Sequence, residues 1–173
     1  SYLFSMAMNI SVDSLSSVTL PELLSSWAED NDIPNKAIEL EITESLLMQN
    51  ITTALDVLTR CRLKGFGLAI DDFGTGYSSM SQLSNVPFTK LKIDRSFVHD
   101  SANDPSAVAI LESSADLAKK LEMIITAEGV EDQSYSDQVV RVGCDLVQGY
   151  FIAKPMPANK LAVWIKQWEP GLA

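Results

Sequence analysis

Side chains that end in oxygen dominate the residues of this sequence that could do chemistry. The carboxylates, carboxamides and lysine that follow short apolar runs are Asn9, Glu41, Asp71, Asp72, Lys92, Glu128 and Gln148. Oxygen ligands of this kind select Mg²⁺ or Mn²⁺ over zinc or copper. Asp71 and Asp72 are adjacent, so each could offer a carboxylate to one of two cations about 3.5–4 Å apart, beside the positive charge of Lys92. Such a site suits the hydrolysis of a phosphodiester, because the cations activate a water and neutralise charge on the phosphoryl oxygens.

The composition argues against several other kinds of site. The 173 residues carry a formal charge of −10, which disfavours attraction to nucleic acid polymers or anionic lipid. Cys61 and Cys144 form no CxxC pair, and His99 is the only histidine. A zinc finger, a disulfide scaffold and Cys/His or Ser/His/Asp catalysis are therefore disfavoured. No apolar run reaches the roughly 20 residues of a membrane span and no signal peptide is visible, so we expect a cytoplasmic protein without direct membrane contact.

The elements that must position these residues follow a repeating order. Short apolar runs alternate with amphipathic segments of helical length, which is typical of parallel βα units. The expected strands are residues 3–9, 37–43, 66–71, 90–94, 123–128 and 145–152. Thr19 with Glu22 predicts a capping box, Asn50 and Asp104 predict helix N-caps, and Gly143 predicts a helix end. Residues 1–173 show no linker or change of composition, so we expect one domain.

Each expected strand ends in a polar side chain that is costly to bury without a purpose. The carboxyl ends of parallel strands gather on one face, where α/β barrels and open α/β sheets carry their sites. Six βα units are visible, whereas a closed barrel normally has about eight. The sequence therefore predicts an α/β fold of the TIM-like (β/α) barrel type, incomplete by about two N-terminal strands.

Several motifs, in order along the chain, closely resemble the EAL-domain family. They are residues 8–11 (MNIS), 41–44 (EITE), 71–79 (DDFGTGYSS), 91–98 (LKIDRSFV), 127–131 (AEGVE), 148–150 (QGY) and 154–155 (KP). The resemblance extends from Asn9 to Pro157 and implies a TIM-like barrel. It also implies a bacterial phosphodiesterase that linearises cyclic di-GMP to pGpG with Mg²⁺ or Mn²⁺. Ca²⁺ is expected to inhibit such an enzyme, because its longer and looser coordination misplaces the attacking water.

The resemblance implies a metal-binding role for five residues. Asn9, Glu41 and Asp71 would hold the first metal. Asp71, Asp72 and Glu128 would hold the second metal or its water.

Further roles in catalysis and substrate binding follow from the same resemblance. Lys92 would position the nucleophilic water and the phosphate, and Glu128 is also the candidate general base. Glu44 would hold the loop after Asp72 rather than bind metal. The residues expected around the substrate and its loops are Asp94, Glu131 and Gln148.

The family's Glu-Ala-Leu motif, whose Glu is a metal ligand, does not precede Met8 in this sequence. We expect it upstream of Ser1, and we expect these 173 residues alone to be poorly active because the ligand set is incomplete. The expected partners are cyclic di-GMP, a second copy of the chain in a homodimer, and regulatory domains of a larger protein. The alternatives are a module that binds cyclic di-GMP without cleaving it, or an interaction domain of a larger bacterial signalling regulator.

Plainer interpretations exist for each residue taken alone. Asp71 and Asp72 precede a Gly-rich segment and suit an ordinary turn. Lys92 and Asp94 share a strand face and could form a structural ion pair. Glu128 could lie in a solvated loop, and His99 is expected at the surface with no catalytic role. The convergence of several strand ends on one rim is what favours the metal site.

Overall fold

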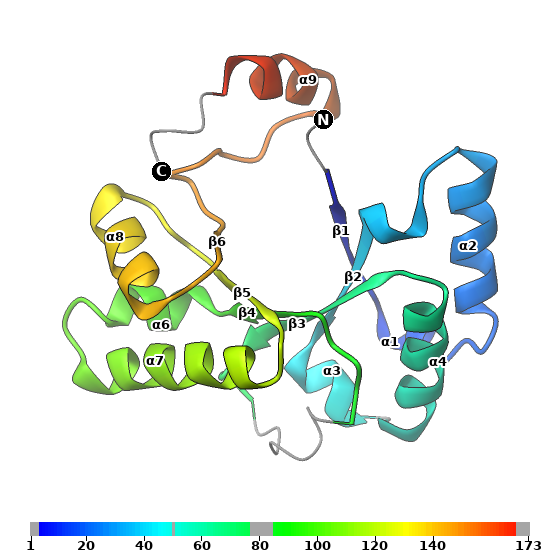
Figure 1. The fold of residues 1–173 in the computed structure, drawn as a ribbon, viewed down its shortest axis with the longest axis horizontal. Helices are drawn as coiled ribbons and strands as arrows, with labels where there is room; N and C mark the ends of the chain where they lie inside the picture. Colours follow the sequence, from blue (N-terminus) through cyan, green and yellow to red (C-terminus); the bar gives the residue numbers. More distant parts are fainter. Residues whose placement is uncertain (1–3, 50, 77–84, 169–173) are drawn as a thin grey trace.

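One parallel sheet organises the molecule. The computed structural model describes residues 4–49, 51–76 and 85–168. Within these ranges six strands pair in sequential order: β1 (Met6–Asn9), β2 (Ile38–Thr43), β3 (Gly67–Phe73), β4 (Lys90–Ile93), β5 (Ile124–Ala127) and β6 (Leu146–Val147). Every neighbouring pair is parallel. The sheet curls like part of a barrel wall (Figure 1), which confirms the predicted α/β class.

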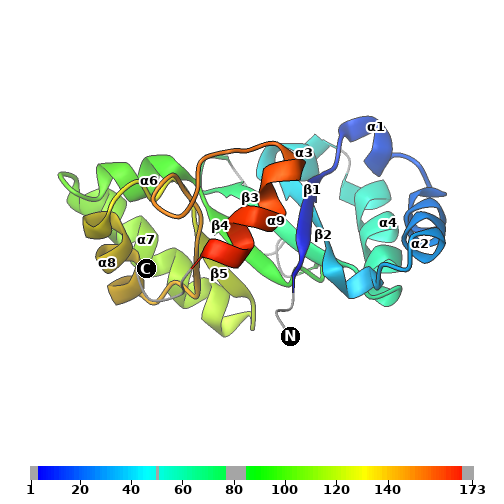
Figure 2. The same cartoon turned by 90° about the horizontal axis from the view of Figure 1, so that it is seen from above.

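Helices return the chain from the end of one strand to the start of the next. The described helices are α1 (Val12–Leu15), α2 (Leu20–Asp30), the 3-10 helix η1 (Asn35–Ala37), α3 (Glu44–Gln49), α4 (Ile51–Leu63), α6 (Arg95–Asp100), α7 (Pro105–Lys120), α8 (Gln133–Val142) and α9 (Ala158–Gln167). Helices α2, α4, α7 and α8 lie outside the curl, whereas α9 lies across its open side (Figures 1 and 2). None of these described helices has the length and apolar character needed to cross a lipid bilayer.

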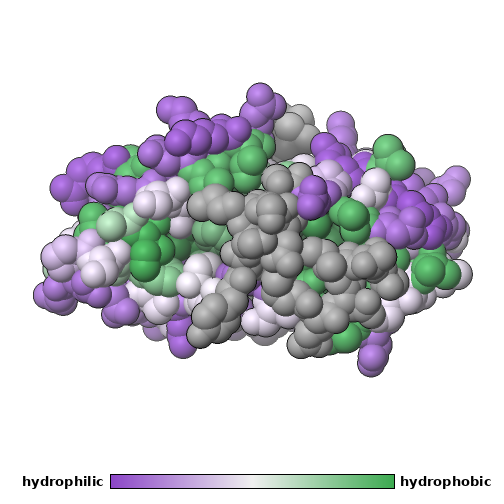
Figure 3. All heavy atoms as spheres, turned by 90° about the horizontal axis from the view of Figure 1, so that it is seen from below, coloured by the Kyte–Doolittle hydropathy of each residue, from purple (hydrophilic) through white to green (hydrophobic). Residues whose placement is uncertain are grey.

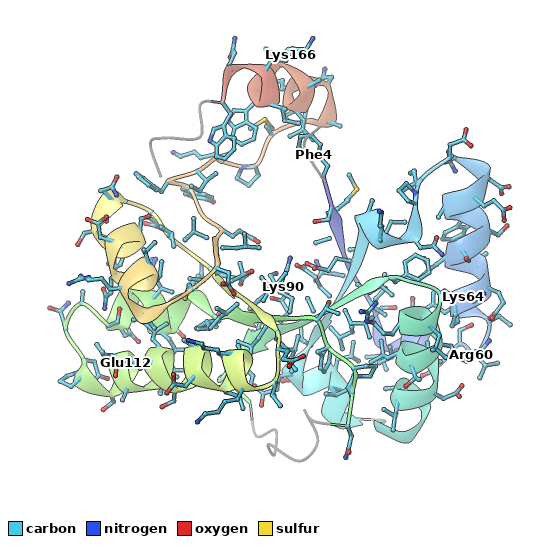
Figure 4. All side chains as sticks on the ribbon, in the orientation of Figure 1. Phe4, Arg60, Lys64, Lys90, Glu112 and Lys166 are labelled. Atoms are coloured by element: carbon cyan, nitrogen blue, oxygen red, sulfur yellow. The ribbon has the colours of Figure 1, made fainter. Side chains whose placement is uncertain are left out.

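Alternation along the strands separates an apolar outer face from a polar inner face. On β2, Leu40 and Ile42 are fully buried. Glu39 and Glu41 alternate with them and point to the other face. Strand register places Glu39 and Glu41 on the same face as Lys90 of β4, which lies on the concave side of the sheet (Figure 4). The core on the outer face combines strand and helix residues, including Leu68, Ile70, Leu91, Ile93, Val57, Leu58 and Leu111.

Helix boundaries follow the predicted signals at some positions and not at others. The side chain of Asp104 accepts a hydrogen bond from the amide of Ser106 and caps α7, and Gly143 ends α8 with φ of 97°. The predicted capping box is wrong, because the side chain of Thr19 makes no capping hydrogen bond. Glu22 instead forms an ion pair with Arg60 of α4. Glu22 therefore pairs with a residue of another helix instead of capping its own.

The last strand is shorter than the predicted range 145–152, since β6 contains only Leu146–Val147. Beyond it the chain turns at Gly149, where a Cβ would lie 2.0 Å from the carbonyl oxygen of Val130. The backbone of this turn bonds to Val130 rather than extending the ladder. The predicted N-cap at Asn50 lies outside the described residues.

Candidate functional site

A buried lysine occupies the centre of the concave rim. The side chain of Lys92, on β4, is 4% exposed. Its Nζ lies 2.7 Å from Glu41 Oε1, 2.9 Å from Asp71 Oδ1 and 2.7 Å from Glu128 Oε1. These carboxylates come from β2, from β3 and from the residue after β5. Carboxylates separated by up to 87 positions in sequence (Glu41 to Glu128) therefore meet at one ammonium group.

A local irregularity brings two consecutive carboxylates to the same place. Successive side chains of a regular strand point to opposite faces. The register between β3 and β4 shifts between Ile70 and Phe73, and Asp72 has a left-handed φ of 54°. Aspartate tolerates this conformation better than most residues. Oxygens of Asp71, Asp72 and Glu128 consequently all lie within 4.8 Å of one another.

The donor set fits a divalent cation. Carboxylate oxygens are the ligands that Mg²⁺ and Mn²⁺ prefer. Asp71 Oδ1 is buried and, although close to Lys92, it makes no hydrogen bond of good geometry within the described ranges. A further oxygen ligand for a metal is near, because strand register sets Asn9 of β1 directly beside Glu41 of β2. A cation at Asp71, Asp72 and Glu128 would give Asp71 Oδ1 a second charged partner beside Lys92.

Burial and charge together shift the pKa values at this site. Burial lowers the pKa of Lys92, but the neighbouring carboxylates of Glu128, Glu41 and Asp71 outweigh that effect and raise the pKa above its ordinary value. Burial raises the pKa of Glu128, and Lys92 partly opposes the rise. The pKa of Asp72 is raised by burial and by the charges of Asp71 and Asp94. Lys92 therefore stays charged, while Asp72 and Glu128 bind protons more readily than exposed carboxylates do.

Glu44, the first residue of α3, holds the segment that follows the two aspartates. It is 2% exposed, and its Oε2 accepts hydrogen bonds from the amides of Gly74 at 3.0 Å and Gly76 at 3.2 Å. A Cβ on Gly76 would lie 2.8 Å from the Glu44 carboxyl carbon. This contact ties the backbone after Asp72 to the end of β2.

A hollow of about 370 Å³ opens beside the acidic cluster. Its lining residues are Asp72, Asp94, Arg95, Glu128, Gly129, Glu131, Gln148, Gly149 and Tyr150. Asp94 is the N-cap of α6 and accepts from the amide and hydroxyl of Ser96. The structural ion pair between Lys92 and Asp94 is not seen, because Lys92 bonds to the other three carboxylates. The remaining predicted residues, Glu131 and Gln148, line this hollow.

His99 also contacts this region, although no sequence pattern predicts that it does. It was expected at the surface, where its side chain is 34% exposed, but its Nε2 also lies 2.8 Å from the carbonyl oxygen of Gly129 and its ring stacks on Tyr135. These contacts span 30 and 36 positions in sequence. Its place on the helix directly after the Lys92 strand is the one signal that could have pointed to it.

Comparison with known proteins identifies the family that shares this sequence. Residues 2–155 match the sequence model of the EAL domain. The chain is 37% identical over 152 residues to cyclic di-GMP phosphodiesterase RocR of Pseudomonas aeruginosa, which covers 88% of this chain and 39% of that protein. The chain thus spans about two fifths of the length of this relative.

Solved structures share the fold. The PaMucR phosphodiesterase, in complex with c-di-GMP, superposes with a TM-score of 0.86 at 34% identity, covering 91% of this chain and 64% of that one. The manganese and cyclic di-GMP complex of BlrP1 from Klebsiella pneumoniae at pH 9.0 gives a TM-score of 0.82 at 29% identity, covering 87% and 39%. The curled sheet is therefore the fold of these domains, one of which has been solved with a divalent metal.

Proposed function

Because this chain belongs to the EAL domain family, we propose that it hydrolyses one phosphodiester bond of cyclic di-GMP and releases the linear dinucleotide pGpG. The observation that carries this proposal is the convergence of Glu41, Asp71 and Glu128 on Lys92, with Asp72 close enough to share a cation with Asp71 and Glu128. Hydrolysis of a phosphodiester by two metal ions needs carboxylate oxygens to bind the metals, and the Lys92 ammonium adds a fixed positive charge beside them.

Two divalent cations, Mg²⁺ or Mn²⁺, are the proposed cofactors. Asn9, Glu41 and Asp71 would hold the first, and Asp71, Asp72 and Glu128 the second. The bound cations would lower the pKa of an attacking water and neutralise the phosphoryl oxygens. The manganese complex of a related structure supports this choice of metal class.

Lys92 and Glu128 are the proposed catalytic residues. The Lys92 ammonium, which is charged and almost fully buried, would hold the scissile phosphate and orient the water through hydrogen bonds from Nζ. Glu128 would accept the proton of that water. Its raised pKa brings the carboxyl closer to the range in which a general base works well near neutral pH.

The substrate region is the hollow beside Glu128. We propose that Gln148, Asp94 and Glu131 contact the nucleotide there, because they line the hollow around the acidic cluster. Glu44 would keep Asp72 in place by holding the two glycine amides that follow it.

We further propose that residues 1–173 act as one domain in the bacterial cytoplasm, joined to regulatory domains, and that the domain forms a homodimer. The two free cysteines suit a reducing compartment. For the dimer, support comes from an apolar hollow of about 250 Å³ on α7 beside β3, lined by Phe73, Ile110 and Leu117. Apolar atoms are also exposed on this underside of the molecule (Figure 3). Sedimentation velocity tests the dimer, and a monomer at micromolar concentration contradicts it.

Turnover of cyclic di-GMP tests the main proposal. The purified protein is incubated with cyclic di-GMP and Mn²⁺ or Mg²⁺, and pGpG is measured by chromatography. Asp71→Asn and Glu128→Gln should each lower kcat at least about 100-fold, as removal of a metal ligand or general base does. Glu112→Gln is the matched control, since Glu112 is exposed on α7 away from the concave side (Figure 4) and should leave kcat unchanged.

Two outcomes of this assay bear on the alternatives. Tight binding of cyclic di-GMP without any product contradicts the hydrolase and supports a binding module. Full turnover with Ca²⁺ alone contradicts the proposed metal chemistry, because Ca²⁺ coordination is too loose to place the attacking water.

A further inference from the structure

The residue that follows Glu128 is confined on one side by helix α6. The amide of Glu128 donates to the carbonyl oxygen of Ile93 at 3.1 Å, which fixes the backbone at the end of β5. Gly129 then turns the chain with φ of 69°. A Cβ at Gly129 would lie 2.4 Å from the Cβ of Arg95, in the first turn of α6. Only glycine fits this approach, so the turn that carries Glu128 is pressed against α6.

The next residue is held from the opposite side by the turn after β6. The amide of Val130 donates to the carbonyl oxygen of Gln148 at 3.1 Å, and the Val130 carbonyl oxygen accepts from the amide of Phe151 at 3.0 Å. Val130 is fully buried. Glu128 and Val130 are therefore both anchored through their backbones, and Gly129 is the joint between them.

His99 bonds to that joint. Its Nε2 lies 2.8 Å from the Gly129 carbonyl oxygen, which can only accept, so Nε2 carries the hydrogen. No other backbone donor reaches this oxygen in the described parts of the chain. The imidazole is held in place by stacking on Tyr135 of α8, with ring centroids 5.1 Å apart and an angle of 13° between the planes. Glu131 is a more distant neighbour, with Oε1 3.9 Å from Nε2.

We propose that His99 is a positioning residue for Glu128, which it holds in place through the carbonyl of Gly129. This inference rests on the proposed role of Glu128. Glycine has the widest backbone freedom of any residue, so a glycine joint directly after a catalytic carboxylate needs an external restraint. The bond from His99 supplies that restraint from α6, the helix that begins after the Lys92 strand. His99 thereby couples the position of Glu128 to the strand that carries Lys92.

Two substitutions separate the hydrogen bond from the ring. His99→Phe keeps an aromatic ring against Tyr135 and removes the donor. His99→Gln removes the ring and places an amide nitrogen close to the position of Nε2. Asp100→Ala, at an exposed position on the same helix, is the matched control.

The kinetic arm measures kcat and KM for cyclic di-GMP with Mn²⁺. We expect His99→Phe to lower kcat about tenfold with KM within twofold, because small displacements of a catalytic group cost far more in rate than in binding. His99→Gln should keep at least half of the wild-type kcat, and Asp100→Ala all of it. Equal losses in His99→Phe and His99→Gln, unchanged kcat in His99→Phe, or a change confined to KM would each overturn the proposal.

A binding arm without substrate makes the two proposals separable. Calorimetric titration with Mn²⁺ alone should show about threefold to tenfold weaker binding in His99→Phe than in wild type and His99→Gln, in proteins whose melting temperatures agree within a few degrees. If wild type binds Mn²⁺ but produces no pGpG, the proposed hydrolysis fails while this comparison still decides the role of His99. Identical Mn²⁺ affinities in all variants overturn the positioning role.

Discussion

Replacing Lys92 by methionine removes the positive charge at the centre of the carboxylate cluster and keeps a side chain of similar length. Each ion pair at 2.7 Å has a gross attraction of roughly 6 kcal/mol at an effective dielectric constant of about 20, most of which offsets the cost of burying the charges. Removing one partner of such a cluster leaves the others uncompensated. We therefore expect Lys92→Met to lose about 3–5 kcal/mol of unfolding free energy at pH 8 without metal.

The loss should depend on pH with a defined sign. Without Lys92, the Glu128 carboxyl loses the cation that opposes its burial, so its pKa rises further in the folded protein and folding binds protons. A carboxyl whose folded pKa is raised keeps its stabilisation below its unfolded pKa and loses it as the pH rises through the folded pKa. The deficit of Lys92→Met should accordingly shrink to about 1 kcal/mol near pH 4.5 and grow toward pH 8.

Urea unfolding followed by circular dichroism, in EDTA at several pH values, measures this deficit. Lys90→Met is the matched control, because Lys90 lies on the same face of β4 and pairs, among the described residues, with Glu39 alone, at 2.8 Å. Its loss should be smaller and less dependent on pH. Added Mn²⁺ should stabilise Lys92→Met more than wild type, since the cation replaces the missing charge. Equal stability of Lys92→Met and wild type at pH 8, or a deficit independent of pH, would refute the electrostatic argument.

Three other perturbations test contacts around the site. Glu44→Ala removes the acceptor of two partly buried amide hydrogen bonds, so unfolding free energy should fall by about 2–3 kcal/mol and kcat about tenfold, measured by urea titration and pGpG release. Gly149→Ala places a Cβ 2.0 Å from the Val130 carbonyl oxygen and should cost at least about 2 kcal/mol in the same titration; an unchanged midpoint contradicts the packing. Burial raises the pKa of the Cys61 thiol from 9.0 to about 11, so stability should be constant below pH 9 and decline between pH 9 and 11 as the unfolded thiol ionises. Cys61→Ala should make that decline shallower, and Cys144, whose pKa burial also raises to about 11, should account for what remains.

Local patterns predicted the elements and the rim well. Leu40 and Ile42 alternate with Glu39 and Glu41, and this period of two already separates a core face from an inner face. Since parallel strands end on one side, the polar residues at strand ends were expected together, and Lys92 indeed contacts carboxylates from neighbouring strands. The N-cap Asp104 needs only a partner two residues away, so it too was predictable.

Signals that depend on distant partners could not be predicted in this way. Glu22 suits a capping box by spacing, but Arg60, 38 positions away, binds its carboxylate instead. The contact of His99 with Gly129 spans 30 positions and has no local signature.

The sequence by itself determined which residues carry charge, which strand face they occupy and at which end of the sheet they gather, because side-chain alternation and capping act over a few residues. Only the tertiary structure decided that β3 shifts register before Phe73, which brings Asp71 and Asp72 close to Glu128, and that Lys92 rather than a lone carboxylate occupies the centre. The distances between these side chains depend on how the sheet curls and how the helices pack on it. That geometry is the sum of many long-range contacts, and no short stretch of sequence contains it.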